Sequence, residues 1–210
     1  FFSTTEVSNE QYRAFITYLK TNQRSNDLVI AQVDSAAWTS TFAYNAPYVN
    51  YYFQHTAYDN YPVVNITYEG AQLYCDWLTA QYKNKGYKVK VRLPEADEWI
   101  TAAQGGNSQN TFGWEGNNLT DKKGNPLANY KWNMEKTIIV SPVNSYQPNA
   151  FGIYNMSGNV AEMLQTKGNH KGGSWFSEQQ YVTVLGEDEY NNITTASPFI
   201  GFRTVIEVSK

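Results

Sequence analysis

Residues 149–164, NAFGIYNMSGNVAEML, place the strongest demands on the fold of this chain. Gly152 and Gly158 supply backbone freedom where side chains would clash, and the aromatic and aliphatic residues around them supply apolar bulk. Glu162 carries the only charge of the stretch. A buried carboxylate needs a partner, and Asn159, three residues earlier, offers an oxygen and no positive charge.

Two interpretations of the segment from Asn159 to Glu162 follow from its chemistry. Side-chain oxygens together with turn carbonyls suit a hard cation such as Ca2+. Alternatively, the segment begins a helix with Glu162 in its first turn, where the helix dipole stabilises a negative charge. Spacing alone favours the helix and leaves both interpretations open.

The chain of 210 residues is long enough for one large core or two small ones. Nothing in it has the composition of a linker, so we expect one domain over residues 1–210. A net charge of −3 with interspersed signs gives no indication of nucleic-acid binding, and no apolar run has the length of a membrane span. The unusual feature is 17 Tyr, 10 Phe and 6 Trp with 17% charged residues, which favours a surface that faces a ligand or partner.

Three segments show the pattern of amphipathic helices. The first follows a capping box at residues 8–11 and has a single apolar stripe up to Leu19. The second begins after Thr67, and Cys75, the only cysteine, lies in its apolar stripe, so we expect a buried and unreactive thiol. The third begins at Pro94, has acidic residues in its first turn and ends at a glycine pair.

The remaining segments predict short strands and long loops. Residues 44–48 and 50–53 show no helical period, and we expect residues 27–62 to form an ordered excursion that is packed by its own aromatic residues. Residues 105–129 are dense in Gly and Asn and are interpreted as loop. His55 and His170 each lack a second ligand nearby, so we expect structural roles for both. Strands are expected at residues 89–93, 138–140, 171–176 and 201–206.

Helices early in the chain and short strands late in the chain give an α+β pattern. Eight motifs then resemble, in order, those of the formylglycine-generating-enzyme or sulfatase-modifying-factor family. They lie at residues 5–12, 62–67, 92–94, 112–114, 142–143, 149–162, 172–175 and 201–203. The resemblance implies the family's elaborated C-type-lectin-like fold, which has little regular secondary structure and long ordered loops held by buried aromatic residues and ions.

The resemblance also supplies a test of activity. Family enzymes oxidise a cysteine of a client sulfatase to formylglycine with a copper-binding pair of their own cysteines. The family's active-site serine matches Ser174, and the two cysteine positions match Ser177 and Val182. Serine is a poor ligand for a soft metal and valine is none, whereas Cu(I) selects thiolates. The resemblance therefore implies a domain that is not an enzyme and holds no copper, and Cys75 lies on the wrong element to replace the pair.

Structural calcium is a further implication of the resemblance. The family holds a cation at a Gly-Asn-x-x-Glu turn, which matches the Asn159 side chain, the Val160 carbonyl and the Glu162 carboxylate. This match reverses the preference for a helix that spacing alone gives. The residues that match a second family site are Asn129, Tyr130 and, in a shorter loop, Glu135.

Residues 37–62 are similar to enzyme-like lipoproteins of gliding motility and type IX secretion in Bacteroidota. This resemblance implies a structural part of a secretion and motility machine on the periplasmic side of the outer membrane or in the cell envelope. Other envelope proteins would be the partners. Membrane contact would come only through a lipid anchor outside the given sequence.

Two other function classes stay open. In C-type-lectin-like proteins the region between the last two glycine motifs displays a ligand surface, so residues 176–200 would form a ligand- or glycan-binding module. The other class is an enzyme, either a sulfatase-modifying oxidoreductase or relocated chemistry, for which no Ser-His-acid order is evident. The residues considered for relocated chemistry are Ser174, Ser177, His170 and Glu178. The residues expected on the ligand surface are Tyr181, Glu187, Asp188, Glu189 and Tyr190.

Overall fold

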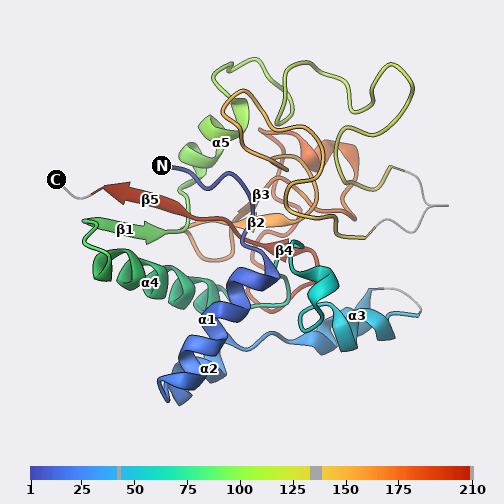
Figure 1. Ribbon diagram of the computed structural model, residues 1–210. Coiled ribbons are helices and arrows are strands. Elements are labelled where there is room, and N and C mark those ends of the chain that lie inside the picture. The colour runs from blue at the N-terminus through green and yellow to red at the C-terminus, as the bar shows by residue number, and fades with distance from the viewer. Residues whose placement is uncertain (42–43, 133–138, 209–210) are drawn as a thin grey trace.

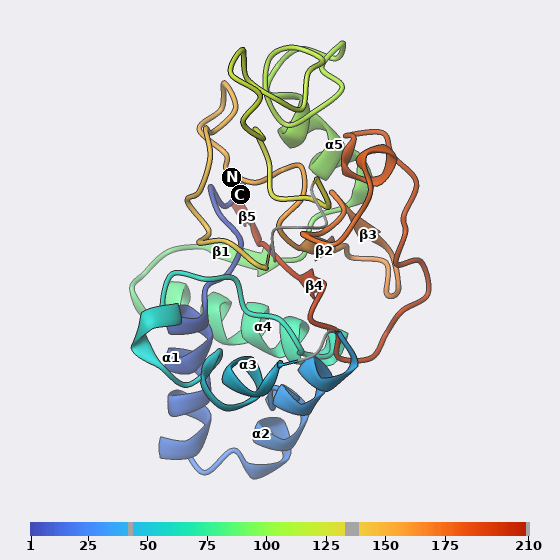
Figure 2. The ribbon, with the colours of Figure 1, turned by 90° about the vertical axis from the view of Figure 1, so that its right-hand side faces the viewer.

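The computed structural model describes residues 1–41, 44–132 and 139–208. The helices and strands of these residues are, in chain order, α1 (Asn9–Thr21), α2 (Ser25–Ala31), η1 (Ser35–Ser40), α3 (Ala46–Tyr51), η2 (Thr56–Tyr58), α4 (Tyr68–Asn84), β1 (Val89–Arg92), α5 (Ala96–Gln104), β2 (Ala161–Met163), β3 (His170–Lys171), η3 (Gln179–Val182), β4 (Ile200–Gly201) and β5 (Val205–Val208). Long irregular segments separate them (Figure 1), as the α+β prediction with long ordered loops requires. Figure 2 shows α1–α4 at one end of the molecule, α5 with the long loops at the other, and the short strands between them.

Helices α1 and α4 begin where the sequence predicts because a side chain caps each of them. The Gln11 backbone N–H donates to the Ser8 hydroxyl (3.3 Å), and the Ser8 N–H donates to the Gln11 side chain (2.9 Å). The Thr67 hydroxyl accepts from the N–H three residues later in the same way. The apolar faces of the two helices meet with the rings of Tyr12 and Tyr74 stacked, 5.8 Å between centroids.

Helix α5 begins at Ala96, two residues later than the predicted start at Pro94. The cause is local: Glu95 has an extended backbone (φ −72°, ψ 158°) and stands at the N-cap, and its N–H donates to the Glu98 carboxylate (2.9 Å). Gly105 ends the helix as predicted, in the left-handed region at φ 60°.

Two small sheets hold the strands. In the first, β1 pairs with β5 in antiparallel orientation. In the second, β2 lies between β3 and β4, antiparallel to β3 and parallel to β4. The register places Glu162 of β2 beside Gly201 of β4. Two motifs that are far apart in the sequence therefore meet at Glu162.

The strand predictions are confirmed only in part. The strand predicted at residues 89–93 corresponds to β1. Ile138 of the strand predicted at 138–140 lies outside the described residues, and the other two residues are not in a strand. The strand predicted at 201–206 is interrupted at 202–204, between β4 and β5.

The strand predicted at residues 171–176 is wrong beyond β3, because Gly172 and Gly173 adopt φ values of 94° and 65° that no strand allows. The predicted close approach of the backbone is confirmed. A Cβ atom on Gly172 would lie 3.1 Å from the Trp99 ring, and one on Gly173 would lie 2.8 Å from the Tyr181 carbonyl. The glycines therefore make room for the segments that pack against this turn.

The interpretation of residues 44–48 and 50–53 as non-helical is wrong at α3, and α2 was not predicted. Helices α2 and α3 have seven and six residues, which is too short for an apolar period to show. The predicted packing by aromatic residues is confirmed, because Trp38 is 1% exposed and its ring lies 5.0 Å from that of Tyr52. The Tyr52 ring lies in turn 5.2 Å from Tyr58.

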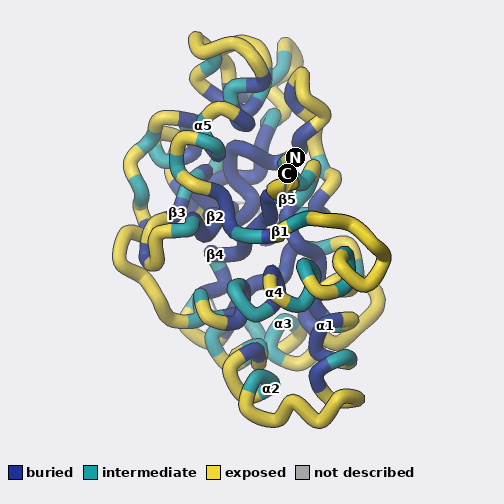
Figure 3. Tube along the Cα trace, turned by 90° about the vertical axis from the view of Figure 1, so that its left-hand side faces the viewer, coloured by how far each residue is buried: buried dark blue, intermediate teal, exposed yellow. Residues whose placement is uncertain are grey.

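Burial follows this arrangement. Figure 3 shows the buried part of the trace running through the centre of the molecule around β2, with the exposed parts in the surrounding loops and helix ends. Cys75 is buried in the core that α1 and α4 share, as predicted. Within the described ranges, none of the helices has the length and apolar character that crossing a bilayer requires.

Candidate functional site

Glu162 is completely buried and has a positively charged partner, Arg203. The Arg203 Nε and Nη2 atoms donate to its two carboxylate oxygens, each over 2.6 Å, and Trp99 Nε1 donates to one of them over 2.6 Å. The register of β2 and β4 explains this pairing, since it places Gly201, two residues before Arg203, beside Glu162. The premise that Glu162 lacks a positive partner is therefore wrong, and so is a helix at this position, because Glu162 lies in β2.

Arg203 also donates hydrogen bonds to two backbone carbonyls from other parts of the chain. Its Nη1 donates to the Ser3 carbonyl (3.2 Å), and its Nη2 donates to the Tyr154 carbonyl (2.9 Å). Burial would lower the pKa of Arg203, but the carboxylate of Glu162 outweighs burial and raises it. The buried guanidinium of Arg203 thus connects the motif at residues 201–203 with the start of the chain and with the stretch at residues 149–164.

A second buried carboxylate, Glu6, lies in the same region and was missed by the sequence prediction. Its oxygens accept from the Asn159 side chain (2.8 Å) and from the Asn155 side chain (3.1 Å). Burial raises the pKa of Glu6 to about 7, against the opposing charge of Arg203. The available signal was that Glu6 is one of the two acids in the motif at residues 5–12, which resembles the family.

Asn159 bridges three segments in a left-handed conformation at φ 66°. Its side-chain oxygen accepts from the Asn129 side chain (3.1 Å) and from the Ser141 N–H (2.8 Å). The oxygens of Glu162 accept from Arg203, as described above. A cation at this turn would have to displace those donors, so the donor set of Asn159 and Glu162 does not fit a calcium ion.

The other residues of the calcium prediction lie in different surroundings. The predicted ligand at Val160 is its backbone carbonyl, and the side chain of this residue is completely buried in an apolar cluster. The side-chain oxygen of Asn129 is buried and finds no hydrogen-bond partner within the described ranges, whereas the Tyr130 carbonyl accepts from the Trp132 N–H (2.7 Å). Glu135 lies outside the described residues, so the second calcium site stays a prediction.

The two serines at the family's active-site positions lie together. The Ser174 hydroxyl lies 2.5 Å and the Ser177 hydroxyl 3.2 Å from the hydroxyl of Tyr190. Ser177 also donates to the Glu189 carboxylate. Burial raises the pKa of Tyr190 to about 12, so this phenol stays protonated at neutral pH. Hydroxyl groups bonded to one another therefore occupy the place where the resemblance puts the first thiol.

Val182, at the second cysteine position, is completely buried. It packs in an apolar cluster with Phe112 and Tyr130, and a Cβ atom on Gly173 would lie 2.9 Å from its side chain. The structure thus brings Val182 next to the Gly-Gly-Ser turn, as the resemblance implies, but surrounds it with apolar groups. Neither position supplies a thiolate for copper.

The expected ligand surface lies partly in the interior. Tyr190 is buried, and the Asp188 carboxylate accepts from the N–H groups of His170 (2.6 Å) and Tyr190 (3.0 Å). Glu187 and Glu189 are exposed and Tyr181 is half-buried. Only part of the predicted set is therefore available to a ligand.

The residues considered for relocated chemistry do not form a catalytic group. His170 is buried, and its Nδ1 atom lies 3.6 Å from Asp188 without a hydrogen bond. Glu178 is exposed and lies 3.5 Å from Lys131. Within the described ranges neither serine is bonded to His170, and the Ser177 hydroxyl donates to the Glu189 carboxylate instead. His55 is exposed and caps a short turn through Nδ1, a structural role.

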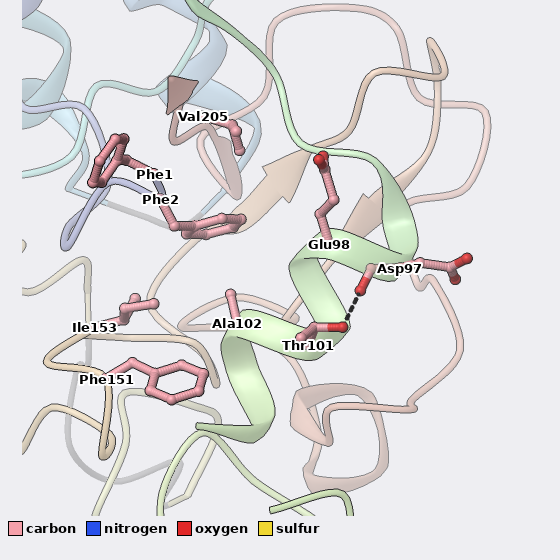
Figure 4. A pocket seen from close by; sticks show the side chains of 9 residues that line it. All are labelled: Phe1, Phe2, Asp97, Glu98, Thr101, Ala102, Phe151, Ile153 and Val205. Atoms are coloured by element: carbon pink, nitrogen blue, oxygen red, sulfur yellow. Dashed lines mark hydrogen bonds between the residues drawn. The ribbon is translucent and has the colours of Figure 1, made fainter. Parts of the chain in front are cut away.

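An open pocket of about 570 Å³ lies beside α5 (Figure 4). Aromatic and aliphatic side chains, among them Phe2, Phe151 and Ile153, line its walls, and Asp97 and Glu98 of α5 lie at its edge. It is formed by elements other than the loop that carries Ser174 and Ser177. The pocket therefore belongs to a different part of the surface from the family's active-site positions.

The sequence profile described as "Sulfatase-modifying factor enzyme 1-like domain" matches residues 1–208. The chain belongs to this family. It is 33% identical over 136 residues to a formylglycine-generating enzyme of Thermomonospora curvata, which covers 59% of this chain and 37% of that protein. It is also 33% identical over 164 residues to the inactive C-alpha-formylglycine-generating enzyme 2 of Bos taurus, which covers 68% of this chain and 49% of that protein. The chain thus spans less than half the length of either relative.

Two solved structures are similar to the fold of this sulfatase-modifying-factor domain. CarF superposes with a TM-score of 0.68 and 20% identity over 100% of this chain and 86% of the other. Treponema denticola variable protein 1 superposes with a TM-score of 0.64 and 18% identity over 99% and 84%. At these identities the likeness concerns the fold alone, and it agrees with the predicted C-type-lectin-like fold of the family.

Proposed function

We propose that this domain is a non-catalytic member of the sulfatase-modifying-factor family that serves as a structural or assembly component of a bacterial cell envelope. The observation that carries the first half of the proposal is the pair of residues at the cysteine positions. Ser177 is bonded to Glu189 and Tyr190, and Val182 is buried among apolar side chains. Cu(I) selects thiolates, and neither residue offers one.

No other thiol of the chain replaces the pair. Cys75 is the only cysteine and lies in α4, within the apolar core that α4 forms with α1. Burial raises the pKa of its thiol to about 12, so the nucleophilic thiolate is disfavoured at neutral pH. The existence of a relative that is named inactive supports a member of this family without the oxidation chemistry.

The envelope role rests on the similarity of residues 37–62 to lipoproteins of gliding motility and type IX secretion. This segment carries aromatic side chains at the surface, since Tyr44 is 95% and Tyr51 54% exposed. Tyrosine is enriched at protein interfaces because it offers a large apolar face and a hydroxyl group. These residues are where we expect an envelope partner to bind.

The alternative of a ligand- or glycan-binding module on residues 176–200 has less support. Tyr190 is buried and Asp188 is engaged with backbone N–H groups. The exposed acids Glu187 and Glu189 alone do not form a pocket with apolar walls, which small-molecule sites typically have.

The absence of catalysis is tested with a sulfatase peptide that contains the target cysteine, incubated with the domain and copper. We expect no aldehyde by mass spectrometry. The matched control is the double variant Ser177→Cys with Val182→Cys, which restores both thiols, and we expect it to bind Cu(I). Aldehyde formed by the unaltered domain would overturn the proposal.

The assembly role is tested by affinity capture from a membrane-envelope fraction of a gliding bacterium. We expect a secretion or motility component to be retained, and we expect Tyr51→Ala to reduce its retention. Retention that is the same with and without this substitution would move the interface away from residues 37–62. Recovery of no envelope protein would contradict the assembly role.

A further inference from the structure

Two hollows flank Trp114 in the loop region between α5 and residue 130. One of about 430 Å³ is lined by Trp114, Glu115, Leu127 and Gln147, among others. The other, of about 440 Å³, shares the first three of these residues and adds side chains such as Lys122. Sites for small molecules occupy roughly 300–1,000 Å³, so each hollow has room for one.

The indole of Trp114 is held in a fixed position. Its ring stacks on that of Phe112, with 5.1 Å between centroids and 12° between planes, and Phe112 is 2% exposed. Trp114 Nε1 donates to the Asn118 carbonyl over 3.2 Å. The stacking covers one face of the indole, and the half-buried ring lines both hollows. A rigid aromatic surface costs little entropy when a ligand binds to it.

Polar side chains around this ring have free hydrogen-bonding groups. Glu115 and Gln147 are exposed, and neither side chain makes a hydrogen bond to any residue in the described part of the chain. Asp121 differs, because its carboxylate accepts from two N–H groups of its own turn and from the Asn125 side chain. Glu115 and Gln147 are therefore available to a ligand, whereas Asp121 serves its loop.

We propose that Trp114 is the aromatic surface of a saccharide-binding site formed by these two hollows. The apolar C–H face of a sugar ring carries partial positive charge and packs on the electron-rich face of an indole. The amide of Gln147 donates to and accepts from hydroxyl groups, and the carboxylate of Glu115 accepts from them.

This site is separate from the positions that carry the proposed function. Ser177 and Glu189 line neither of the two hollows. Saccharide binding can therefore be present or absent whatever the outcome of the aldehyde assay. It would give an envelope domain a means to contact glycan in addition to protein.

The test is ligand-observed NMR and isothermal titration calorimetry with soluble oligosaccharides of the cello-, chito- and malto- series. We expect at least one series to bind. We expect Trp114→Ala to weaken binding by at least about tenfold, which corresponds to about 1.4 kcal/mol. We expect a smaller, several-fold loss for Gln147→Ala, which changes an exposed side chain and keeps the fold. The matched control is Tyr87→Ala, an exposed aromatic residue between α4 and β1 that lines neither hollow, and it should leave binding unchanged.

Three results would overturn the assignment. The first is that none of these sugars binds the unaltered protein. The second is that binding survives Trp114→Ala in a folded variant or, if that variant does not fold, that Gln147→Ala has no effect. The third is that choline chloride, a cationic probe for the same aromatic face, binds in place of the sugars.

Discussion

The stability of this domain should fall as the pH rises through the range in which Glu6 ionises. Glu6 is completely buried, and burial raises its pKa from 4.5 to about 7. Between these two pH values the folded state holds a proton at Glu6 that the unfolded chain has lost. The free energy of unfolding therefore decreases with rising pH. At about 1.4 kcal/mol for each pH unit of displacement, this group accounts for a loss of about 3 kcal/mol between pH 4 and pH 8.

The measurement is urea unfolding of the unaltered domain and of Glu6→Gln across that pH range. Titrating groups remote from Glu6 are common to both proteins and cancel in the difference, so the difference reports Glu6 together with its buried neighbours Arg203 and Glu162. We expect the unaltered domain to lose about 3 kcal/mol relative to Glu6→Gln between pH 4 and pH 8. Glu10→Gln, a substitution at an exposed acid of α1, should show no such trend. A difference that is flat or that rises with pH would refute the assignment of a buried, proton-holding Glu6.

Three further perturbations test the framework around this carboxylate. Arg203→Met should cost about 3–5 kcal/mol in urea unfolding because it leaves Glu162 buried without its partner. Arg24→Met should cost about 0–1 kcal/mol, because Arg24 pairs with Asp27 at the surface. Gly158→Ala should destabilise the domain far more than Gly116→Ala. Both glycines have positive φ, but only a Cβ atom on Gly158 would lie 2.2 Å from a backbone carbonyl, that of Asn129. Similar melting temperatures of the two variants would contradict this close contact. Adding calcium or EGTA should leave the melting temperature of the domain unchanged, because the Glu162 turn does not fit a calcium ion. A rise in melting temperature with calcium that Asn129→Ala abolishes would instead assign an ion to the second predicted site.

Local signals predicted the parts of the fold that local interactions determine. Ser8 and Thr67 cap α1 and α4 as their side chains indicate, and Gly105 ends α5. Helices of six or seven residues, such as α2 and α3, give no period to detect. Helix α5 begins two residues later than predicted because Glu95 has an extended backbone. The sequence around Pro94 gives no signal of this difference.

Part of the candidate site was also predictable from the sequence, and part of it was not. The resemblance located Ser174, Ser177 and Val182 next to one turn, and the structure places them there. The pairing of Glu162 with Arg203 was not predicted, because it depends on the parallel register of β2 and β4 across about forty residues of chain. The sequence neighbours of Glu162 show no positive partner, and the family resemblance then led to the prediction of calcium.

Hydrogen bonds and an ion pair between buried side chains connect segments of this fold that long strand ladders would otherwise join. Glu6, Asn159 and Asn129 form one chain of side-chain hydrogen bonds, and Glu162 with Arg203 forms a second bonded group. Such groups are costly when one member is lost, so substitutions within them are strongly restricted. The hydroxyls of Ser174, Ser177 and Tyr190 make their own bonds outside both groups. The framework can therefore persist whichever residues occupy positions 177 and 182, which is a physical reason that the family can contain a relative that is named inactive.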